Sequence, residues 1–299
     1  MRTPGAGGPR FARTSSVAKL RIVTLLFLGL RASAPVSAQI SNSHPDAQLD
    51  ADRLAGDVFQ NEINAQINDH SLWCYRELKE ERGEKRLFEA CQTKDGEINR
   101  LLEVNGEPLN RKQCQAEDQR IQKLLNYPDK MRKEQEKQQE DARQAQNLMK
   151  MVANAFRFQY EGTQGSLIKL KFSPNPSFHP SGRMAQVFHH MEGSLLIDGQ
   201  QERLAEINGQ LTSEVKFAGG LLGHLDQGGT FFVKQQDLGS GHWELTTMDV
   251  QMNGRALLFK TIAVRERETY TDFRQAPGGV TPQQGFELLR QDPAFRGCH

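Results

Sequence analysis

The spacing of apolar residues divides the first part of the chain into one helix and three strands. Apolar residues recur at close to helical spacing from Leu49 to Ile67, which predicts an amphipathic helix ending near residues 69–70. Strand candidates follow at residues 72–81, 85–93 and 97–104. Asp95-Gly96 and Asn105-Gly106 are turn signals of the kind that join antiparallel strands. We therefore expect a three-stranded meander after the helix.

The next stretch, residues 111–155, has the composition of a helix. It contains one proline, Pro128, and no glycine, and residues 130–146 are almost entirely helix formers with charges of both signs. Apolar residues gather at its two ends, so we expect two helices, or one kinked at Pro128, whose middle projects into solvent. Residues 111–160 hold 11 basic and 7 acidic residues. This small excess favours a solvated helix over a surface for acidic partners.

From residue 155 onward the pattern is that of β-strands. Apolar and polar residues alternate in places, and pairs such as Asp198-Gly199 and Asn253-Gly254 mark turns. The strand candidates are residues 155–160, 167–172, 183–191, 194–198, 204–211, 214–217, 230–237, 242–252 and 257–267. We interpret residues 276–299 as a loose C-terminal tail.

A single sheet accounts for both sets of strands. Three strands alone do not easily bury a face, and the later strands would leave exposed edges. The sequence therefore predicts an α+β fold. It consists of one large curved antiparallel sheet, an unclosed half-barrel, with helices covering the concave face and a long charged helical insertion at residues 111–155. This domain is expected over residues 39–275.

Residues 1–38 have the pattern of a secretory signal peptide. They carry six basic residues and no acid, an apolar core at residues 22–30, and small residues before a cleavage site between Ala38 and Gln39. The apolar core is too short for a membrane span, which needs about 20 residues. An uncleaved anchor is the alternative. We expect export to the periplasm or secretion, with no transmembrane span in the mature chain.

The net charge changes sign when this segment is set aside. The full chain has 38 basic and 37 acidic residues, a net charge of +1. Removal of the six basic residues leaves a mature chain with a net charge of −5. Binding of nucleic acid is therefore disfavoured. A hydrophobic content of 37% is also too low for a polytopic membrane protein.

Export would allow disulfides among the four cysteines. If Arg82-Gly83 is a two-residue turn, Cys74 and Cys91 lie opposite each other at a non-hydrogen-bonded pair, where Cα atoms approach closely. We predict a disulfide between them. Free buried thiols remain an alternative, and Cys114 or Cys298 could compete.

The order of elements, together with several short motifs, resembles the periplasmic lipoprotein-carrier superfamily. The motifs are the segments 193–198 (GSLLID), Arg203-Leu204, Ile207-Asn-Gly209 with Leu211, and, before the insertion, residues 75–77, 85–89 and 104–109. The superfamily includes the outer-membrane lipoprotein-sorting proteins and a sensor of envelope stress. The resemblance covers about residues 45–275 and implies an unclosed β-barrel with an apolar cavity that holds acyl chains. The long charged helix and the extended C-terminal segment depart from the carriers.

Apolar strand faces supply the candidate ligand cavity. Its residues are Phe158, Ile168, Leu170, Phe172, Phe188, Leu195, Ile197, Leu204, Ile207 and Phe231. A lipid or a lipoprotein acyl chain under a helical lid would use these residues, but an ordinary core filled by helices would use them too. The choice depends on cavity volume, which the sequence does not report.

Catalytic motifs are weak. His189-His190 is expected on a strand, where neighbouring side chains point to opposite faces, and no metal-ligand spacing is present. Ser194 lacks the glycine context of a nucleophile elbow. We predict no cofactor, no metal and no enzyme activity. The alternatives are an envelope interaction module whose contact surface is the helix at 130–146, and a hydrolase that uses His189 or His190.

Overall fold

The computed structural model describes residues 45–180, 184–220, 222–256 and 260–291. The expected signal peptide and its cleavage site at Ala38-Gln39 lie outside these residues. The helices are α2 (Pro45–Asn68), α3 (Arg111–Leu125), α4 (Pro128–Ala155) and α5 (Pro282–Arg290), with short 3-10 helices η1 (Met184–His190) and η2 (Ala218–Gly220). The strands are β1 (Leu72–Glu81), β2 (Glu84–Thr93), β3 (Gly96–Val104), β4 (Glu107–Pro108), β5 (Phe156–Gln164), β6 (Leu167–Pro174), β7 (Met191–Asp198), β8 (Arg203–Leu211), β9 (Val215–Phe217), β10 (Gly223–Leu225), β11 (Thr230–Asp237), β12 (Trp243–Ala256) and β13 (Lys260–Ala276).

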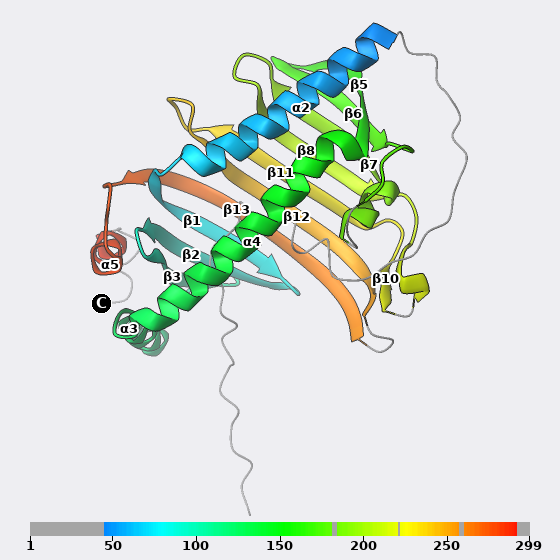
Figure 1. Ribbon diagram of the computed structural model, residues 1–299. Coiled ribbons are helices and arrows are strands. Elements are labelled where there is room, and N and C mark those ends of the chain that lie inside the picture. The colour runs from blue at the N-terminus through cyan, green and yellow to red at the C-terminus, as the bar shows by residue number, and fades with distance from the viewer. Residues whose placement is uncertain (1–44, 181–183, 221, 257–259, 292–299) are drawn as a thin grey trace, which may run out of the picture.

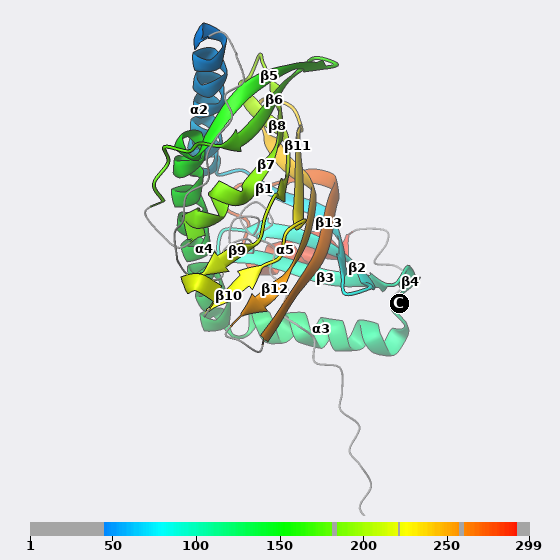
Figure 2. The same ribbon diagram turned by 90° about the vertical axis from the view of Figure 1, so that its right-hand side faces the viewer.

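All described strands belong to one antiparallel sheet that does not close into a barrel. The order is β4-β3-β2-β1-β13-β12-β11-β8-β7-β6-β5, and β10 and β9 extend it beside β12. Helices α2 and α4 run across one face of this sheet (Figure 1), and the edge-on view shows both on the same side (Figure 2). The predicted α+β class is confirmed. The strands before and after the helical insertion share the sheet because β1 pairs with β13 along its whole length.

The first hairpin has the register predicted from its turn. Arg82 and Gly83 both have positive φ, 52° and 83°, and join β1 to β2 as a two-residue turn. Cys74 therefore lies opposite Cys91, and Lys79 lies opposite Arg86. The like-charge pair is tolerated because Lys79 is buried against Glu266 and Glu268 of β13, with 2.9 Å between its Nζ and Glu268 Oε1. Burial alone would lower the pKa of Lys79, but these two carboxylates outweigh it and raise the pKa.

The insertion forms two helices, as its composition indicated. Asn110 caps α3 through a reciprocal pair of hydrogen bonds with Gln113, and Pro128 lies in the first turn of α4, where its missing N–H costs nothing. Met131 and Leu148 near the two ends of α4 are buried. Between them most of the described side chains are exposed, and Arg132 and Arg143 form ion pairs with Asp129, Glu136 and Glu140 of the same helix. Partner binding through residues 130–146 stays a prediction.

Two expectations are wrong. Residues 183–191 were expected to be a strand, but η1 occupies 184–190, because Ala185, Val187 and Phe188 are all buried, a spacing that a tight helical turn provides and a strand does not. The C-terminal segment was expected to be a loose tail, but α5 begins at the capping residue Thr281 and buries Phe286 and Leu289. These side chains pack with Cys91 and Ile98 in a second core. Ala90, the neighbour of Cys91 in β2, belongs to the main core under α2 and α4, so the second core lies on the opposite face of the sheet.

Candidate functional site

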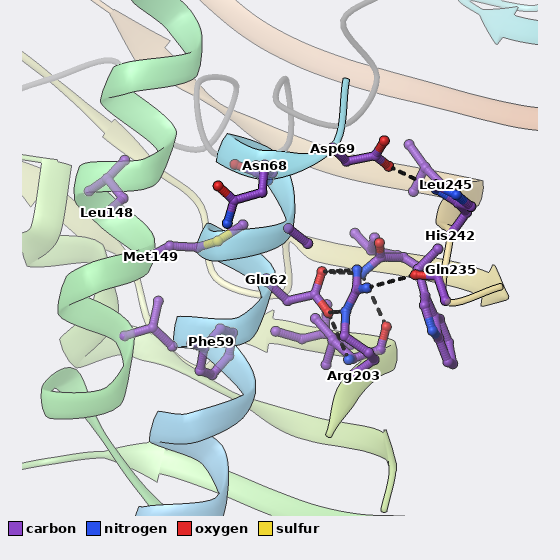
Figure 3. A pocket seen from close by; sticks show the side chains of 18 of the residues that line it. Phe59, Glu62, Asn68, Asp69, Leu148, Met149, Arg203, Gln235, His242 and Leu245 are labelled. Atoms are coloured by element: carbon purple, nitrogen blue, oxygen red, sulfur yellow. Dashed lines mark hydrogen bonds and ion pairs between the residues drawn. The ribbon is translucent and has the colours of Figure 1, made fainter. Parts of the chain in front are cut away.

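A cavity of about 730 Å³ lies between the helices α2 and α4 and the sheet (Figure 3). Phe59 and Ala65 of α2 and Leu148, Met149 and Val152 of α4 form the helical wall. The strands β6, β7, β8, β11 and β12 supply most of the opposite wall. This volume falls within the range of about 300–1,000 Å³ that is typical of small-molecule sites.

One end of the cavity is apolar and aromatic. Its side chains come from η1 and from the strands β5, β6, β7 and β11: Phe156, Phe172, Phe188, Met191 and Phe231. All five are buried. Phe156 packs edge-on against Phe172 and Phe188, with ring centroids 4.8 and 5.4 Å apart, an arrangement that aromatic quadrupoles favour. These contacts hold the rings in place around the space.

A pair of glycines lets two of these rings lie against the sheet. Gly193 and Gly209 face each other on β7 and β8, with Phe172 beside Gly193 and Phe231 beside Gly209 on the flanking strands. A Cβ at Gly193 would lie 2.7 Å from the Phe172 ring, and one at Gly209 would lie 2.5 Å from the Phe231 ring. Both distances are below van der Waals contact. A Cβ at Gly193 would also lie 1.9 Å from the Asn208 carbonyl oxygen. The glycines of the sequence motifs at 193–198 and 207–209 are thus required by the close approach of the neighbouring backbone as well as by ring packing.

The other end of the cavity is polar and is centred on a buried ion pair. Glu62 of α2 accepts hydrogen bonds from Arg203 Nε at 2.8 Å and Nη2 at 3.3 Å. It also accepts from the Leu204 backbone N–H at 2.9 Å and from Gln235 Nε2 at 3.2 Å. The guanidinium of Arg203 lies 5.7 Å from the centroid of the Trp243 ring. This network joins the C-terminal half of α2 to the start of β8 and holds the polar end of the cavity in place.

The C-terminal end of α2 adds further polar groups to the same region. Asp69 Oδ2 lies 3.4 Å from His242 Nδ1, and Asp69 Oδ1 accepts from the Ser71 backbone N–H at 2.8 Å (Figure 3). The Oε1 atom of Gln66 is buried without a hydrogen-bond partner among the described residues. Asn68 also lines the cavity. The cavity is therefore amphipathic, with a polar end under α2 and an apolar end under η1 and α4.

The structure places the ten candidate cavity residues in two groups. Five of them line the cavity: Phe172, Phe188, Leu204, Ile207 and Phe231. The other five lie in the packed core around it: Phe158, Leu170, Leu195 and Ile197 are buried there, and Ile168 packs against them partly buried. The apolar sheet face is thus partly the wall of a cavity and partly an ordinary core.

Sequence reasoning missed the helical wall and the polar end of the cavity. Glu62 lies at helical spacing from Ala55 and Phe59, which are both buried. A carboxylate on such an apolar stripe needs a partner in the core, and this was the available signal. Nothing in the sequence indicated that the partner is Arg203, 141 positions away.

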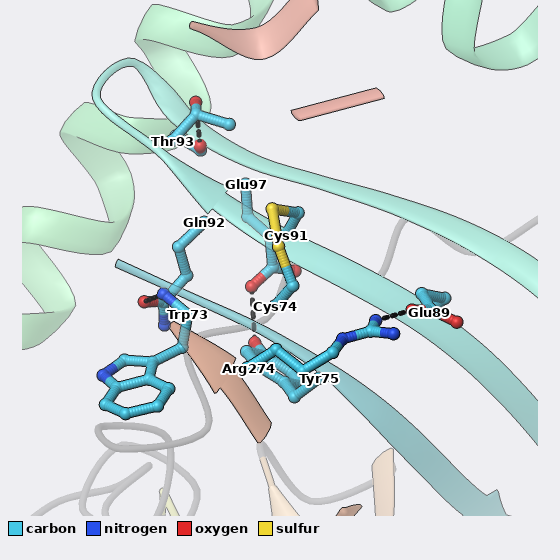
Figure 4. Close-up of a disulfide and its surroundings, with 10 residues drawn as sticks. Trp73, Cys74, Tyr75, Glu89, Cys91, Gln92, Thr93, Glu97 and Arg274 are labelled. Carbon is cyan, nitrogen blue, oxygen red and sulfur yellow. Dashed lines mark hydrogen bonds and ion pairs between the residues drawn. A yellow bond between two sulfur atoms is a disulfide. The ribbon is translucent and has the colours of Figure 1, made fainter. Parts of the chain in front are cut away.

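A disulfide joins Cys74 and Cys91, as the predicted register implied (Figure 4). Their Cα atoms are 4.0 Å apart, and none of the described cysteines is a free thiol. The bond lies on the second core, while the adjacent Tyr75 points to the other face and donates from its hydroxyl to Glu97 Oε2 at 2.6 Å. The bond therefore joins β1 to β2 on the face of the sheet that packs against α5, and it does not border the cavity.

The histidine pair lies at the end of η1 and not on a strand. His190 Nδ1 is 2.7 Å from Ser213 Oγ. Burial lowers the pKa of His190, with a further contribution from His189, and burial also lowers the pKa of His189, helped by His179. Among the described residues, no group of three or more metal-binding side chains gathers anywhere. A hydrolase that uses these histidines stays a prediction.

Comparison with known proteins gives little. No protein-family model matches the chain, and no curated protein matches its sequence. The crystal structure of a DUF1329 family protein from Desulfovibrio piger matches with a TM-score of 0.28 and 8% sequence identity, over 81% of this chain and 99% of that one. A likeness at this level carries no argument about the site. No helix in the described ranges is both long and apolar enough to cross a membrane.

Proposed function

We propose that this is an exported protein that binds a lipid or a lipoprotein acyl chain in the cavity under α2 and α4, without catalysing a reaction. The observation that carries the proposal is the amphipathic lining of this 730 Å³ cavity. An acyl chain fits the aromatic end, and its head group fits the end at Glu62 and Asp69.

The physical gain comes from the apolar end. Each methylene of the acyl chain that leaves water for the apolar end contributes about 0.8 kcal/mol to the free energy of binding. The buried aromatic side chains would also make close contacts with the acyl chain. Part of this gain offsets the loss of translational and conformational freedom of the ligand. Because the rings are held by each other and by the glycine pair at Gly193 and Gly209, little side-chain ordering is left to oppose binding.

Export is supported by the pattern of residues 1–38 and is compatible with the disulfide. Disulfides persist in oxidising compartments such as the periplasm or the extracellular space. The pairing of Cys74 with Cys91 would be unstable in a reducing cytosol. Expression of the full chain followed by N-terminal sequencing of the exported product tests the expected mature start at Gln39.

Ligand binding is tested with the exported protein and the neutral fluorescent probe N-phenyl-1-naphthylamine. The probe should gain fluorescence in the cavity and be displaced by single-chain amphiphiles, and native mass spectrometry should find lipid bound to the protein as purified. Ala65→Trp places an indole inside the cavity wall and should weaken probe binding at least about tenfold. Asn64→Trp, on the exposed side of the same helix, is the matched control and should bind like wild type.

Two results would overturn the proposal. One is the absence of both probe binding and co-purified lipid in a folded protein. The other is equal probe affinity in Ala65→Trp and wild type, since the probe would then bind elsewhere.

A further inference from the structure

The geometry points to a ligand whose head group donates hydrogen bonds, such as an acyl amide, in preference to the carboxylate of a free fatty acid. This inference rests on the proposed function, because it concerns which amphiphile the same cavity accepts. Its basis is the set of acceptors at the polar end, together with the pairing of Arg203 with Glu62.

The cation at this end is already neutralised. Arg203 is the one lysine or arginine among the described lining residues. Two of its nitrogens bind Glu62 at 2.8 and 3.3 Å, and a third lies 3.4 Å from the Gly241 carbonyl oxygen. Both side chains of the pair are largely buried, at 12% and 5% exposure. An entering carboxylate would have to compete with Glu62 for Arg203, and it would leave a buried anion without its partner.

The end of α2 contributes acceptors and a negative field. Asp69 N–H donates to the Ala65 carbonyl oxygen at 2.8 Å, as the helix ends. The carbonyl groups of the following residues, 66–68, face the end of the helix without an amide from a next turn. A helix C-terminus also carries about half a negative charge. This end of the cavity therefore attracts donors and repels anions.

Two side chains add acceptors at the same place. Gln66 Oε1 is buried without a hydrogen-bond partner among the described residues, and it lines the cavity. Asp69 adds a carboxylate whose oxygens face Ser71 N–H and His242. His70 also lines this end and is exposed. A buried acceptor without a hydrogen bond raises the free energy of the folded protein. A ligand N–H that reached Gln66 Oε1 would donate the missing hydrogen bond and remove this cost.

The test compares two ligands of nearly identical shape. Dodecanamide and dodecanoate differ in whether the head is a neutral donor or an anion, because at pH 8 a fatty acid is ionised. Each is used to displace N-phenyl-1-naphthylamine from the exported protein. We expect dodecanamide to displace the probe at a concentration at least about tenfold lower than dodecanoate.

Two variants locate the effect. Gln66→Met keeps the volume but removes the acceptor, and it should reduce the ratio of the dodecanoate to the dodecanamide concentration needed to displace the probe. Gln60→Met makes the same change on the exposed face of α2 and should keep the wild-type preference. Equal or tighter binding of dodecanoate, or an unchanged preference in Gln66→Met, would overturn this inference while the proposed function stands. If neither ligand displaces the probe, both fail.

Discussion

The ion pair between Glu62 and Arg203 is the most exacting test of how the cavity is built. Glu62 is 5% exposed and accepts four hydrogen bonds, from two nitrogens of Arg203, from Leu204 N–H and from Gln235. Glu62→Leu removes all four and leaves a guanidinium that is 12% exposed without its counter-charge. Removing one partner of a buried pair costs about 3–5 kcal/mol, so we expect a loss of that size in the free energy of unfolding.

A variant with both residues replaced by leucine separates the effect of the ion pair from the effect of side-chain packing. Arg203→Leu leaves the Glu62 carboxylate buried with only Leu204 N–H and Gln235 as donors, and it should cost about 3 kcal/mol or more. Glu62→Leu/Arg203→Leu leaves no unpaired charge. Its loss should therefore be smaller than the sum of the single losses by at least about 2 kcal/mol.

Urea unfolding followed by circular dichroism measures these values. The matched control is the pair Arg53 and Asp50 on the same helix, whose side chains are 75% and 62% exposed. Asp50→Ala should cost less than about 1 kcal/mol, as exposed pairs do. Purely additive effects of the two leucine substitutions would refute the reasoning, because they would mean that Glu62 and Arg203 do not depend on each other.

Two further predictions concern the disulfide and the half-buried His190. Cys74→Ala/Cys91→Ala opens a loop of sequence separation 17 and should lower the free energy of unfolding by about 3 kcal/mol. Urea unfolding of the variant and of the oxidised wild type measures this loss, and a value below about 1 kcal/mol would contradict the loop argument. Burial holds the pKa of His190 below its unfolded value of about 6.5, so the unfolded state binds the proton more readily and stability should fall as pH drops from 7.5 to 5.5. His190→Asn should lose less over this range, and an equal loss would exclude His190 as its source.

Local rules were sufficient for much of the fold. The positions of β1, β2 and β3 and the pairing of Cys74 with Cys91 follow from a two-residue turn and from period-two alternation, which act over a few residues. The division of the insertion at Pro128 has an equally local cause, since proline cannot donate within a helix.

Prediction from local sequence pattern failed where the apolar residues are compatible with more than one type of secondary structure. The segment 183–191 has strand-like composition, but residues 184–190 form a 3-10 helix that packs against α4. The segment 282–290 has too few apolar residues to indicate a helix by itself, and α5 exists because Phe286 and Leu289 have a second core to enter. In both places, contacts with distant segments outweigh local preference.

The register of the first hairpin, the helical insertion and a set of apolar strand residues that lie in the core or the cavity wall could all be predicted from the sequence. The tertiary structure alone decided which of those residues line a cavity and which fill a core. Phe172 and Leu170 lie two positions apart on the same strand face, yet only Phe172 borders the cavity. The reason is that the space depends on where α2 and α4 cross the sheet, and this crossing is fixed by contacts such as Glu62 with Arg203, between residues far apart in the chain.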